Sequence, residues 1–253
     1  MLTFGVEDKV AVLRLDDGKA NAVGHQFIDS MNEGLDRAEN EASSVVILGR
    51  AGVFSAGFDL KVLSEGAEAR KALVDKGAAM LLRLFRYPLP VITASSGHAI
   101  AAGALVLLAA DTRLGANIES KYGLNETAIG MSLPPFGLEM AKCRISKRYQ
   151  TEAIIQATLY SPEDAKKVGF IDEVVDQTAL EQRAIDIAEK SLLDFIESGI
   201  SSLSIYEVNK KARDLNIAPC AFAALDIALW DWKAKKSRLS LNNILGLPKP
   251  CTP

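Results

Sequence analysis

The stretch VITASSGHAIAAGALVLLAADTRLGA, residues Val91–Ala116, decides the fold of this chain. It opens with a short strand-like run, Val91–Ala94, and closes with another, Thr112–Ala116. Between them, Gly97–Ala110 is strand-like at its start and helical after Ala101. Strands and helices that alternate with short connections are typical of βαβ units and a parallel sheet.

The same alternation extends toward the N-terminus. Short apolar runs rich in β-branched residues predict strands at Val10–Leu15 and Ser44–Leu48. Apolar residues at helical spacing predict a helix over 25–40, and a long helix over 66–86 ends before two prolines. The glycine- and alanine-rich residues Gly49–Gly57 are expected to form a loop.

Helices predominate after about residue 136, with one strand expected at Ile171–Val175. A boundary near Ser198 divides the chain into a core of residues 1–198 and a helical region of residues 199–253. The last helix carries both tryptophans, so its aromatic surface is expected to be buried on its own domain or against a partner subunit. The helices are expected over residues 136–143, 147–159, 162–167, 177–198, 204–214 and 220–236.

The reactive side chains exclude several classes of protein. The 253 residues include 32 acids, 29 bases, two histidines and three cysteines, with a formal net charge of −3. The cysteines lie far apart without paired spacing, so we expect neither a metal site nor a disulfide scaffold. The near-neutral balance argues against nucleic acid as the main partner. Any catalysis is therefore expected to use carboxylates and backbone groups.

The sequence shows no sign of a membrane span or a secretory leader. The longest apolar run, Ala99–Ala110, is shorter than the roughly 18 residues that a spanning helix needs. The first residues, Met1–Phe4, do not form a basic region followed by an apolar one. Together with the scattered cysteines, these features lead us to expect a cytoplasmic protein without a membrane partner.

Two loops of small residues follow predicted strands. They are Phe54–Leu60 (FSAGFDL) and Gly97–Gly103 (GHAIAAG), and the second opens a helix. Small residues let a ligand approach the backbone, and a helix N-terminus offers free N–H groups. Facing loops of this kind could aim two N–H groups at one oxygen and form an oxyanion hole. Close packing of a helix on a sheet explains the same residues without a ligand, so both interpretations stay open.

Glu126 lies in an otherwise apolar, glycine-punctuated stretch. It is either a turn carboxylate or, if it is buried near an oxyanion hole, an acid–base group with a raised pKa. His25 is interpreted as a solvated residue near a helix start, and His98 as a pocket-wall residue rather than a catalyst. Lys19, in a turn, is either solvated or in contact with a phosphate.

Five motifs in this order resemble the crotonase (enoyl-CoA hydratase/isomerase) superfamily over about residues 3–198. Each motif is weak alone, and the five in register identify the family. The resemblance implies an α/β fold, a crotonase-like spiral of ββα units with a helical C-terminal trimerisation region. The motifs are Lys19–Ala22 (KANA), the two small-residue loops, Asn125–Gly130 (NETAIG), and Ser161–Ala165 (SPEDA) with Val168–Asp172 (VGFID).

The resemblance also implies partners and site residues. The substrate would be an acyl-CoA thioester, with no separate cofactor because coenzyme A is part of the substrate, and the protein would be a homotrimer or a hexamer. The oxyanion-hole donors would be the backbone N–H groups of Phe58 and Ala102, and Ala102 stands where the family frequently has glycine. The residues expected to bind the coenzyme A substrate are Lys19, Ala20, Ala22, Ala56, Gly57, Asp59, Leu60 and His98.

The catalytic acids predict the reaction within the family. Hydratases of this family typically use two glutamates, whose positions here hold Leu105 and Glu126. One carboxylate is enough to move a proton from C2 to C4, so the resemblance predicts isomerisation of a 3-enoyl-CoA to a 2-enoyl-CoA. Two alternatives stay open: a hydratase whose other acid is Asp59, Glu65 or Glu68, and a non-catalytic acyl-CoA-binding subunit.

The end of the chain departs from the family. Residues Ala223–Lys235, with Ile244–Gly246, look like a segment of the capping domain of the enolase superfamily. The barrel and the metal-binding carboxylates of that superfamily are not recognisable in the chain. We interpret this run as a chance similarity of an amphipathic helix.

Overall fold

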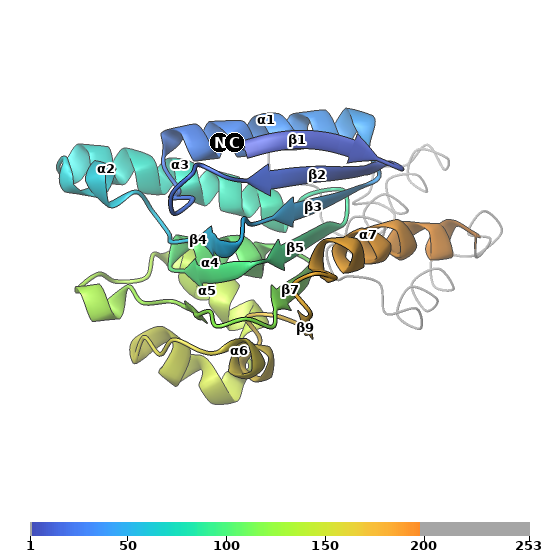
Figure 1. Cartoon of the computed structure of the whole chain (residues 1–253). Coiled ribbons are helices and arrows are strands. Elements are labelled where there is room, and N and C mark those ends of the chain that lie inside the picture. The colour runs from blue at the N-terminus through green and yellow to red at the C-terminus, as the bar shows by residue number, and fades with distance from the viewer. Residues whose placement is uncertain (1, 198–253) are drawn as a thin grey trace, which may run out of the picture.

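The computed structural model describes residues 2–197, with side chains as far as residue 190, and strands and helices alternate along most of this part (Figure 1). The strands are β1 (Leu2–Glu7), β2 (Val10–Leu15), β3 (Ser44–Leu48), β4 (Gly52–Ser55), β5 (Val91–Ser95), β6 (Gly97–Ile100), β7 (Thr112–Ala116), β8 (Tyr122–Gly123) and β9 (Glu173–Val175). The helices are α1 (His25–Glu41), α2 (Leu60–Ser64), α3 (Ala67–Phe85), α4 (Ala102–Ala109), α5 (Pro135–Arg144), α6 (Pro162–Val168) and α7 (Leu180–Glu197).

A large sheet organises the described part of the chain, with its strands in the order β1-β2-β3-β5-β7-β9. The pair β1–β2 is antiparallel, and the other four pairs are parallel. All residues of β3 and β5 are buried, as expected for parallel strands that are covered on both faces. The predicted parallel sheet is therefore confirmed.

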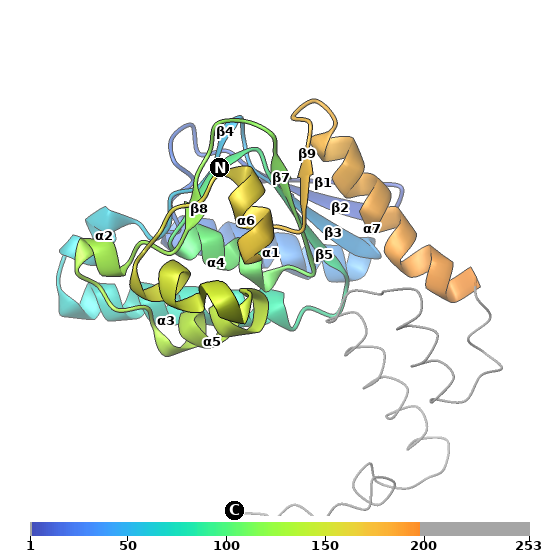
Figure 2. The same cartoon turned by 90° about the horizontal axis from the view of Figure 1, so that it is seen from below.

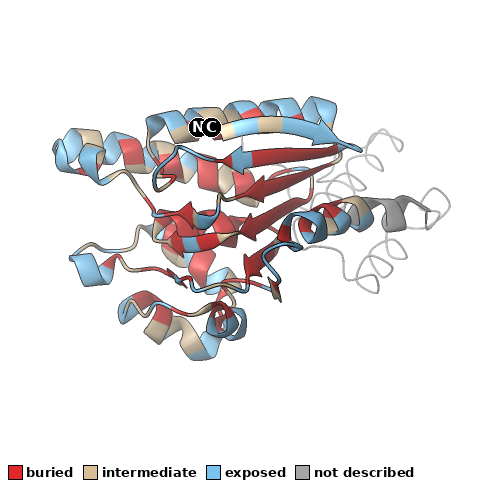
Figure 3. Ribbon diagram, viewed as in Figure 1, coloured by how far each residue is buried: buried red, intermediate tan, exposed pale blue. Residues whose placement is uncertain are grey.

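Helices cover both faces of this sheet (Figure 2). Successive residues of β3 point to opposite faces, so that Val46 joins the apolar cluster under α7, while Ile47 joins the cluster formed with α1, α3 and α4. The buried residues on the α7 side are all aliphatic, such as Leu114 and Ala184, whereas the other side also contains aromatic residues such as Phe54. In Figure 3 the central strands are accordingly buried throughout, between helices with exposed outer faces.

A second, smaller parallel sheet has the order β4-β6-β8. Each of its strands follows one strand of the large sheet, because β4 follows β3, β6 follows β5, and β8 follows β7. Helices then complete each unit: α2 and α3 after β4, α4 after β6, and α5 after β8. This repeated ββα unit confirms the expected crotonase-like architecture.

Most predicted elements are confirmed. The strands Val10–Leu15, Ser44–Leu48 and Thr112–Ala116 have the predicted bounds, because continuous apolar runs with β-branched residues mark buried strands clearly. The predicted change from strand to helix within Gly97–Ala110 is also present, as β6 gives way to α4.

Two predictions about local structure are wrong. Residues Gly49–Gly57 are not a continuous loop, because Gly52–Ser55 forms β4 by pairing with β6. Residues 147–159 are not a continuous α-helix. A 3₁₀ turn, Lys147–Tyr149, is followed by a π-helix, Thr151–Ile155, and the chain is irregular beyond it.

Several predictions fall on residues outside the described part. They concern the helices over 204–214 and 220–236, the burial of the aromatic helix, the trimerisation region and the enolase-like run. Between residues 2 and 197, no helix combines the length and the hydropathy needed to cross a membrane.

Candidate active site

The candidate catalytic groups all follow strands of the small sheet. Phe58 comes shortly after β4, Ala102 shortly after β6, and Glu126 shortly after β8. These strands are parallel neighbours, so their carboxyl ends lie at the same edge of the sheet. The topology therefore gathers one region of backbone from each ββα unit at this edge.

The two small-residue loops are in direct contact. Gly57 has a φ of +95°, which glycine adopts readily and other residues rarely do. A Cβ atom on Gly57 would lie 2.8 Å from the Cβ of Ala101 and 3.3 Å from the backbone nitrogen of Ala102. Glycine at this position therefore lets the loops approach each other closely.

The N–H group of Phe58 faces away from the segment that pairs with it. Val23 forms a parallel bridge to Phe58, in which the N–H of Val23 donates to the carbonyl of Gly57 at 2.8 Å. The N–H of Asp59 donates to the carbonyl of Val23 at 3.2 Å. Because these bonds use the residues on either side of Phe58, its own N–H is directed to the opposite side.

Ala102 is the first residue of α4, so its N–H has no carbonyl partner within the helix and lies at the positive end of the helix dipole. The unusual backbone is one residue earlier, at Ala101, with φ +51° and ψ −125°. A non-glycine residue in this conformation is strained, and such strain is concentrated at functional sites. Alanine in place of the frequent glycine at residue 102 is tolerated, because that residue has ordinary helix geometry.

Glu126 is brought to the same place by β8. The N–H of Ala101 donates to the carbonyl of Gly123 at 2.9 Å, which ties the start of the Glu126 segment to the start of α4. The carbonyl of Glu126 in turn accepts the N–H groups of Ile129 at 3.1 Å and Met131 at 2.9 Å. Glu126 thus begins a tight turn next to the second loop.

The side chain of Glu126 is buried, with 8% of the residue exposed, and its Oε2 has no hydrogen-bond partner among the described residues. Burial raises the pKa of this carboxyl, while a hydrogen bond with its own backbone N–H acts in the opposite direction. Asp111, the other buried carboxylate of the described part, accepts the backbone N–H of Val91 at 2.9 Å. Glu126 therefore has the environment expected of a proton-transfer group.

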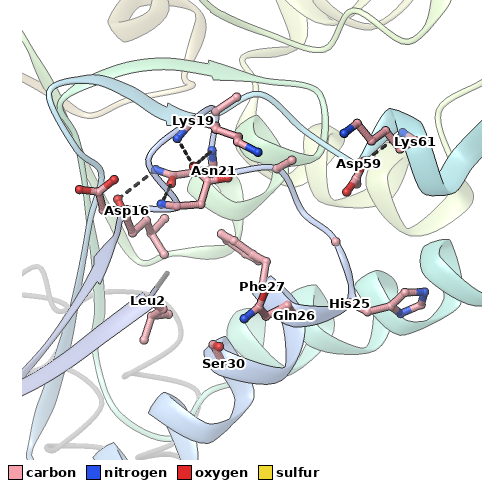
Figure 4. A pocket seen from close by; sticks show the side chains of 15 residues that line it. Leu2, Asp16, Lys19, Asn21, His25, Gln26, Phe27, Ser30, Asp59 and Lys61 are labelled. Carbon is pink, nitrogen blue, oxygen red and sulfur yellow. Dashed lines mark hydrogen bonds between the residues drawn. The ribbon is translucent and has the colours of Figure 1, made fainter.

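A pocket of about 460 Å³ adjoins the first loop (Figure 4). It lies between the turn that carries Lys19, the start of α1, and the start of α2 at Lys61. The pocket is lined by two lysines, Lys19 and Lys61, and by three aspartates, Asp16, Asp17 and Asp59, so positive and negative side chains both face it. Of the residues expected to bind the coenzyme A substrate, those that line this pocket are Lys19, Ala20, Ala22 and Asp59.

The other residues expected to bind coenzyme A do not line the pocket. Ala56 is exposed, and Leu60 is 66% exposed at the first turn of α2. Gly57 is buried where the first loop contacts the second. His98 is also exposed, because the alternation along β6 turns it away from the buried Ala99. The Nδ1 atom of His98 accepts the backbone N–H of Lys121 at 3.0 Å. His98 therefore lies elsewhere and does not form a wall of this pocket.

Asn21 is a site residue that the sequence analysis missed. Its buried amide group donates to the carbonyls of Leu15 at 3.0 Å and Phe54 at 3.1 Å, and its Oδ1 accepts the N–H of Asp17 at 2.9 Å. These bonds hold the Lys19 turn against β4, at the pocket wall. The sequence did carry a signal, an asparagine between two alanines. Asparagine tolerates a positive φ better than most residues, and residue 21 adopts a φ of +49°.

Comparisons with known proteins identify the family of the chain. A family model described as enoyl-CoA hydratase/isomerase matches residues 5–211. The chain belongs to the enoyl-CoA hydratase/isomerase family. An enoyl-CoA hydratase/isomerase family protein from Pseudomonas syringae has a similar crystal structure, with a TM-score of 0.73, 33% identity, and coverage of 94% of this chain and 98% of that one. One protein of Mycobacterium tuberculosis matches in two structures. It is described as an enoyl-CoA isomerase in an apo structure, with a TM-score of 0.71 at 31% identity over 90% of this chain and 96% of that one. It is described as a probable enoyl-CoA hydratase in the other, with a TM-score of 0.73 at 30% identity over 94% of this chain and 98% of that one.

Curated members of the enoyl-CoA hydratase/isomerase family include proteins named for both reactions. The mitochondrial enoyl-CoA delta isomerase 1 of Rattus norvegicus is 32% identical over 190 residues, 73% of this chain and 65% of that protein. A probable enoyl-CoA hydratase of Bacillus subtilis is 27% identical over 195 residues, 75% of each chain. The chain thus spans 65% of the length of the rat isomerase.

A further relative comes from a differently named enzyme. A hydrophobic dipeptide epimerase of a Flavobacteria bacterium is 47% identical over 68 residues, 27% of this chain and 20% of that protein. The similarity therefore covers about a quarter of this chain and a fifth of that protein. The enolase-like run lies outside the described residues, and its interpretation stays a prediction.

The carboxylates considered for a second acid are placed differently from Glu126. Asp59 is the N-cap of α2, where its side chain accepts the N–H of Lys61 at 2.9 Å. Glu65 and Glu68 are exposed near the junction of α2 and α3. Leu105, at the other acid position, is buried, with 1% exposed. Among residues 2–190, whose side chains the structure describes, Glu126 is therefore the one buried carboxylate near the two loops.

Proposed function

We propose that this protein is an acyl-CoA enzyme that converts a 3-enoyl-CoA into the conjugated 2-enoyl-CoA. The observation that carries the proposal is that Glu126 is buried beside two converging loops, the one carboxylate there among residues 2–190, while Leu105 stands at the position of the second acid. The similarity to the mitochondrial enoyl-CoA delta isomerase 1 of Rattus norvegicus supports the isomerase proposal.

The proposed reaction moves one proton. The Glu126 carboxylate takes a proton from C2, and the electron pair of that bond delocalises through the thioester to its carbonyl oxygen and along the former double bond. The N–H groups of Phe58 and Ala102 stabilise the negative oxygen of this dienolate. The carboxylic acid of Glu126 then returns the proton to C4, which leaves the double bond between C2 and C3.

The raised pKa of Glu126 suits both steps. A carboxylate whose pKa is raised by burial is a stronger base than an exposed one, and its protonated form is a weaker acid that persists until C4 is reached. Because a leucine stands at residue 105, no second group is present there to activate a water molecule. The pocket near Lys19 and Lys61 would hold the coenzyme A moiety.

The test is an assay with a 3-enoyl-CoA, followed by formation of the conjugated thioester. The wild-type protein is expected to catalyse isomerisation, and Glu126→Gln is expected to lose about 10²-fold or more of the turnover rate. Glu65→Gln, at an exposed carboxylate, is the matched control and should retain wild-type turnover. Full activity of Glu126→Gln would refute the proposed role.

The same preparation separates the alternatives. A hydratase would add water to crotonyl-CoA faster than it isomerises a 3-enoyl-CoA. A non-catalytic acyl-CoA-binding subunit would bind the thioester and leave both substrates unchanged. Either result would contradict the proposed isomerase.

A further inference from the structure

The Glu126 segment is held along its outer side by residues 151–160, here called the clasp. The backbone groups of Tyr122 and Tyr160 exchange two hydrogen bonds, at 3.0 and 2.9 Å. A Cβ atom on Gly123 would lie 2.7 Å from the carbonyl oxygen of Thr158. Further along, the hydroxyl of Thr127 donates to the carbonyl oxygen of Ile154 at 3.2 Å. The clasp therefore follows the Glu126 segment from β8 to the residue after Glu126.

The clasp has an unusual backbone, which explains why a carbonyl is free to accept the Thr127 hydroxyl. It begins with the π-helix Thr151–Ile155, closed by a hydrogen bond from the N–H of Gln156 to the carbonyl of Thr151 at 3.1 Å. The N–H of Thr158 turns back to the carbonyl of Glu152 instead of continuing the helix to Ile154. Single π-helical turns of this kind occur frequently at functional sites.

Glu126 needs such external support because its carboxylate has little of its own. Its Oε2 has no hydrogen-bond partner among the described residues, so no neighbouring side chain fixes that oxygen. The position of the carboxylate then depends on the packing around the buried side chain and on the placement of the backbone at residue 126. The hydrogen bond that the Thr127 hydroxyl donates to Ile154 is a side-chain contact that joins this backbone to the clasp.

We propose that Thr127 is a positioning residue, which holds Glu126 in its productive orientation through the bond to Ile154. The inference rests on the proposed role of Glu126 as the proton shuttle. Thr127 does not touch the reacting atoms, and the clasp takes no part in the proton transfer. Small displacements of a catalytic group reduce the rate strongly, so loss of this bond should act on turnover more than on substrate binding.

The first experiment compares Thr127→Val, which removes the hydroxyl at nearly constant shape, with Thr127→Ser, which keeps it. We expect the valine variant to lose about tenfold in kcat with KM within a factor of two, and the serine variant to recover most of the loss. Thr151→Val, at an exposed residue of the same clasp, is the matched control and should behave as wild type. Wild-type kcat in a folded Thr127→Val protein would overturn the proposal.

The second experiment repeats Thr127→Val in the Glu126→Gln background. If Thr127 acts through Glu126, the valine substitution costs nothing further there, whereas an equal loss in both backgrounds contradicts a positioning role. Retention of activity by Glu126→Gln alone refutes the proposed function instead, so the two failures are distinguishable. Thermal unfolding of each variant shows whether it is folded. If Thr127→Val and Thr127→Ala both fail to fold, the bond is a requirement of folding, and the positioning role is rejected.

Discussion

At the scale of single residues, the site depends on two residues with an unusual backbone conformation and on one buried carboxylate. Gly57 and Ala101 both have positive φ, and the contact between them sets how closely the two loops approach. Glu126 is buried, and its Oε2 has no hydrogen-bond partner in the described part of the chain, which is unfavourable for a charged carboxylate. Burial raises the pKa of Glu126, which suits proton transfer. The same burial makes the ionised side chain unfavourable in the folded protein, so function and stability conflict at this residue.

This conflict predicts that Glu126→Gln stabilises the protein at neutral pH. The folded-state pKa of Glu126 is raised above its unfolded value, so its contribution to stability is fully present below the unfolded pKa and is lost as the pH rises through the folded pKa. Glutamine has no charge to lose. Thermal unfolding at pH 7.5 should give a higher Tm for the variant, by roughly 2–4 °C for each 1 kcal/mol, and the difference should shrink toward pH 4. A variant less stable than wild type at pH 7.5 would contradict the burial argument.

A substitution at Leu105 can introduce a buried carboxylate, whereas Glu126→Gln removes one. It packs in the core, and its Cδ1 would lie 3.1 Å from a Cβ atom on Gly137 of α5. Leu105→Glu should lower the Tm more at pH 8 than at pH 5, because a buried glutamate is tolerated better when it is protonated. If the second acid distinguishes the two reactions, this variant should also hydrate crotonyl-CoA faster than wild type does. Leu105→Met, which keeps the volume, is the control and should change neither property strongly.

At the scale of elements, the pocket wall depends on how the turn after β2 is attached to β4. The buried Asn21 amide makes this attachment through its bonds to Leu15 and Phe54. Helix α1 supplies an opposite wall and packs on the core, while the start of α2 is held by the Asp59 cap and by backbone bonds to Val23. The turn is therefore one part of the pocket that a single substitution can loosen.

Asn21→Ala is expected to raise KM for the acyl-CoA thioester about tenfold or more while changing kcat less. The substitution leaves buried carbonyl groups without donors, which also costs about 1–3 kcal/mol of stability. Steady-state kinetics and thermal unfolding measure the two effects. Asn40→Ala, on the exposed side of α1, is the control and should leave KM unchanged. An unchanged KM for the Asn21 variant would show that the turn does not contact the substrate.

At the scale of the whole molecule, the ββα repeat explains why distant segments meet. Each unit contributes one strand to the large sheet and the next strand to the small one, so the loops after β4, β6 and β8 lie side by side. The large sheet, covered on both faces, provides the rigid support for this arrangement. Catalytic groups at the ends of neighbouring parallel strands are a general feature of α/β proteins.

The assembly is also testable at this scale. The family resemblance predicts a homotrimer or a hexamer. Light scattering coupled to size exclusion should therefore give a mass three or six times the 27.2 kDa of the chain. A monomer across the micromolar range would contradict this prediction.

The sequence by itself determined the fold and the family. Buried strands such as Val10–Leu15 and Ser44–Leu48 are visible as apolar runs, and the motifs around Gly57, Gly103 and Glu126 are local in the chain. The tertiary structure alone decided β4, the π-helix, the bonds of Asn21 and the contact from Thr127 to Ile154. The pairing of β4, the Asn21 bond to Phe54 and the Thr127 contact depend on partners far away in the sequence, and short polar or glycine-rich segments have no pattern of their own that specifies such partners. The bond that closes the π-helix is local, and no apolar periodicity distinguishes it from an α-helical turn. The candidate acid was therefore readable from the sequence, whereas the contacts that hold it in place required the fold.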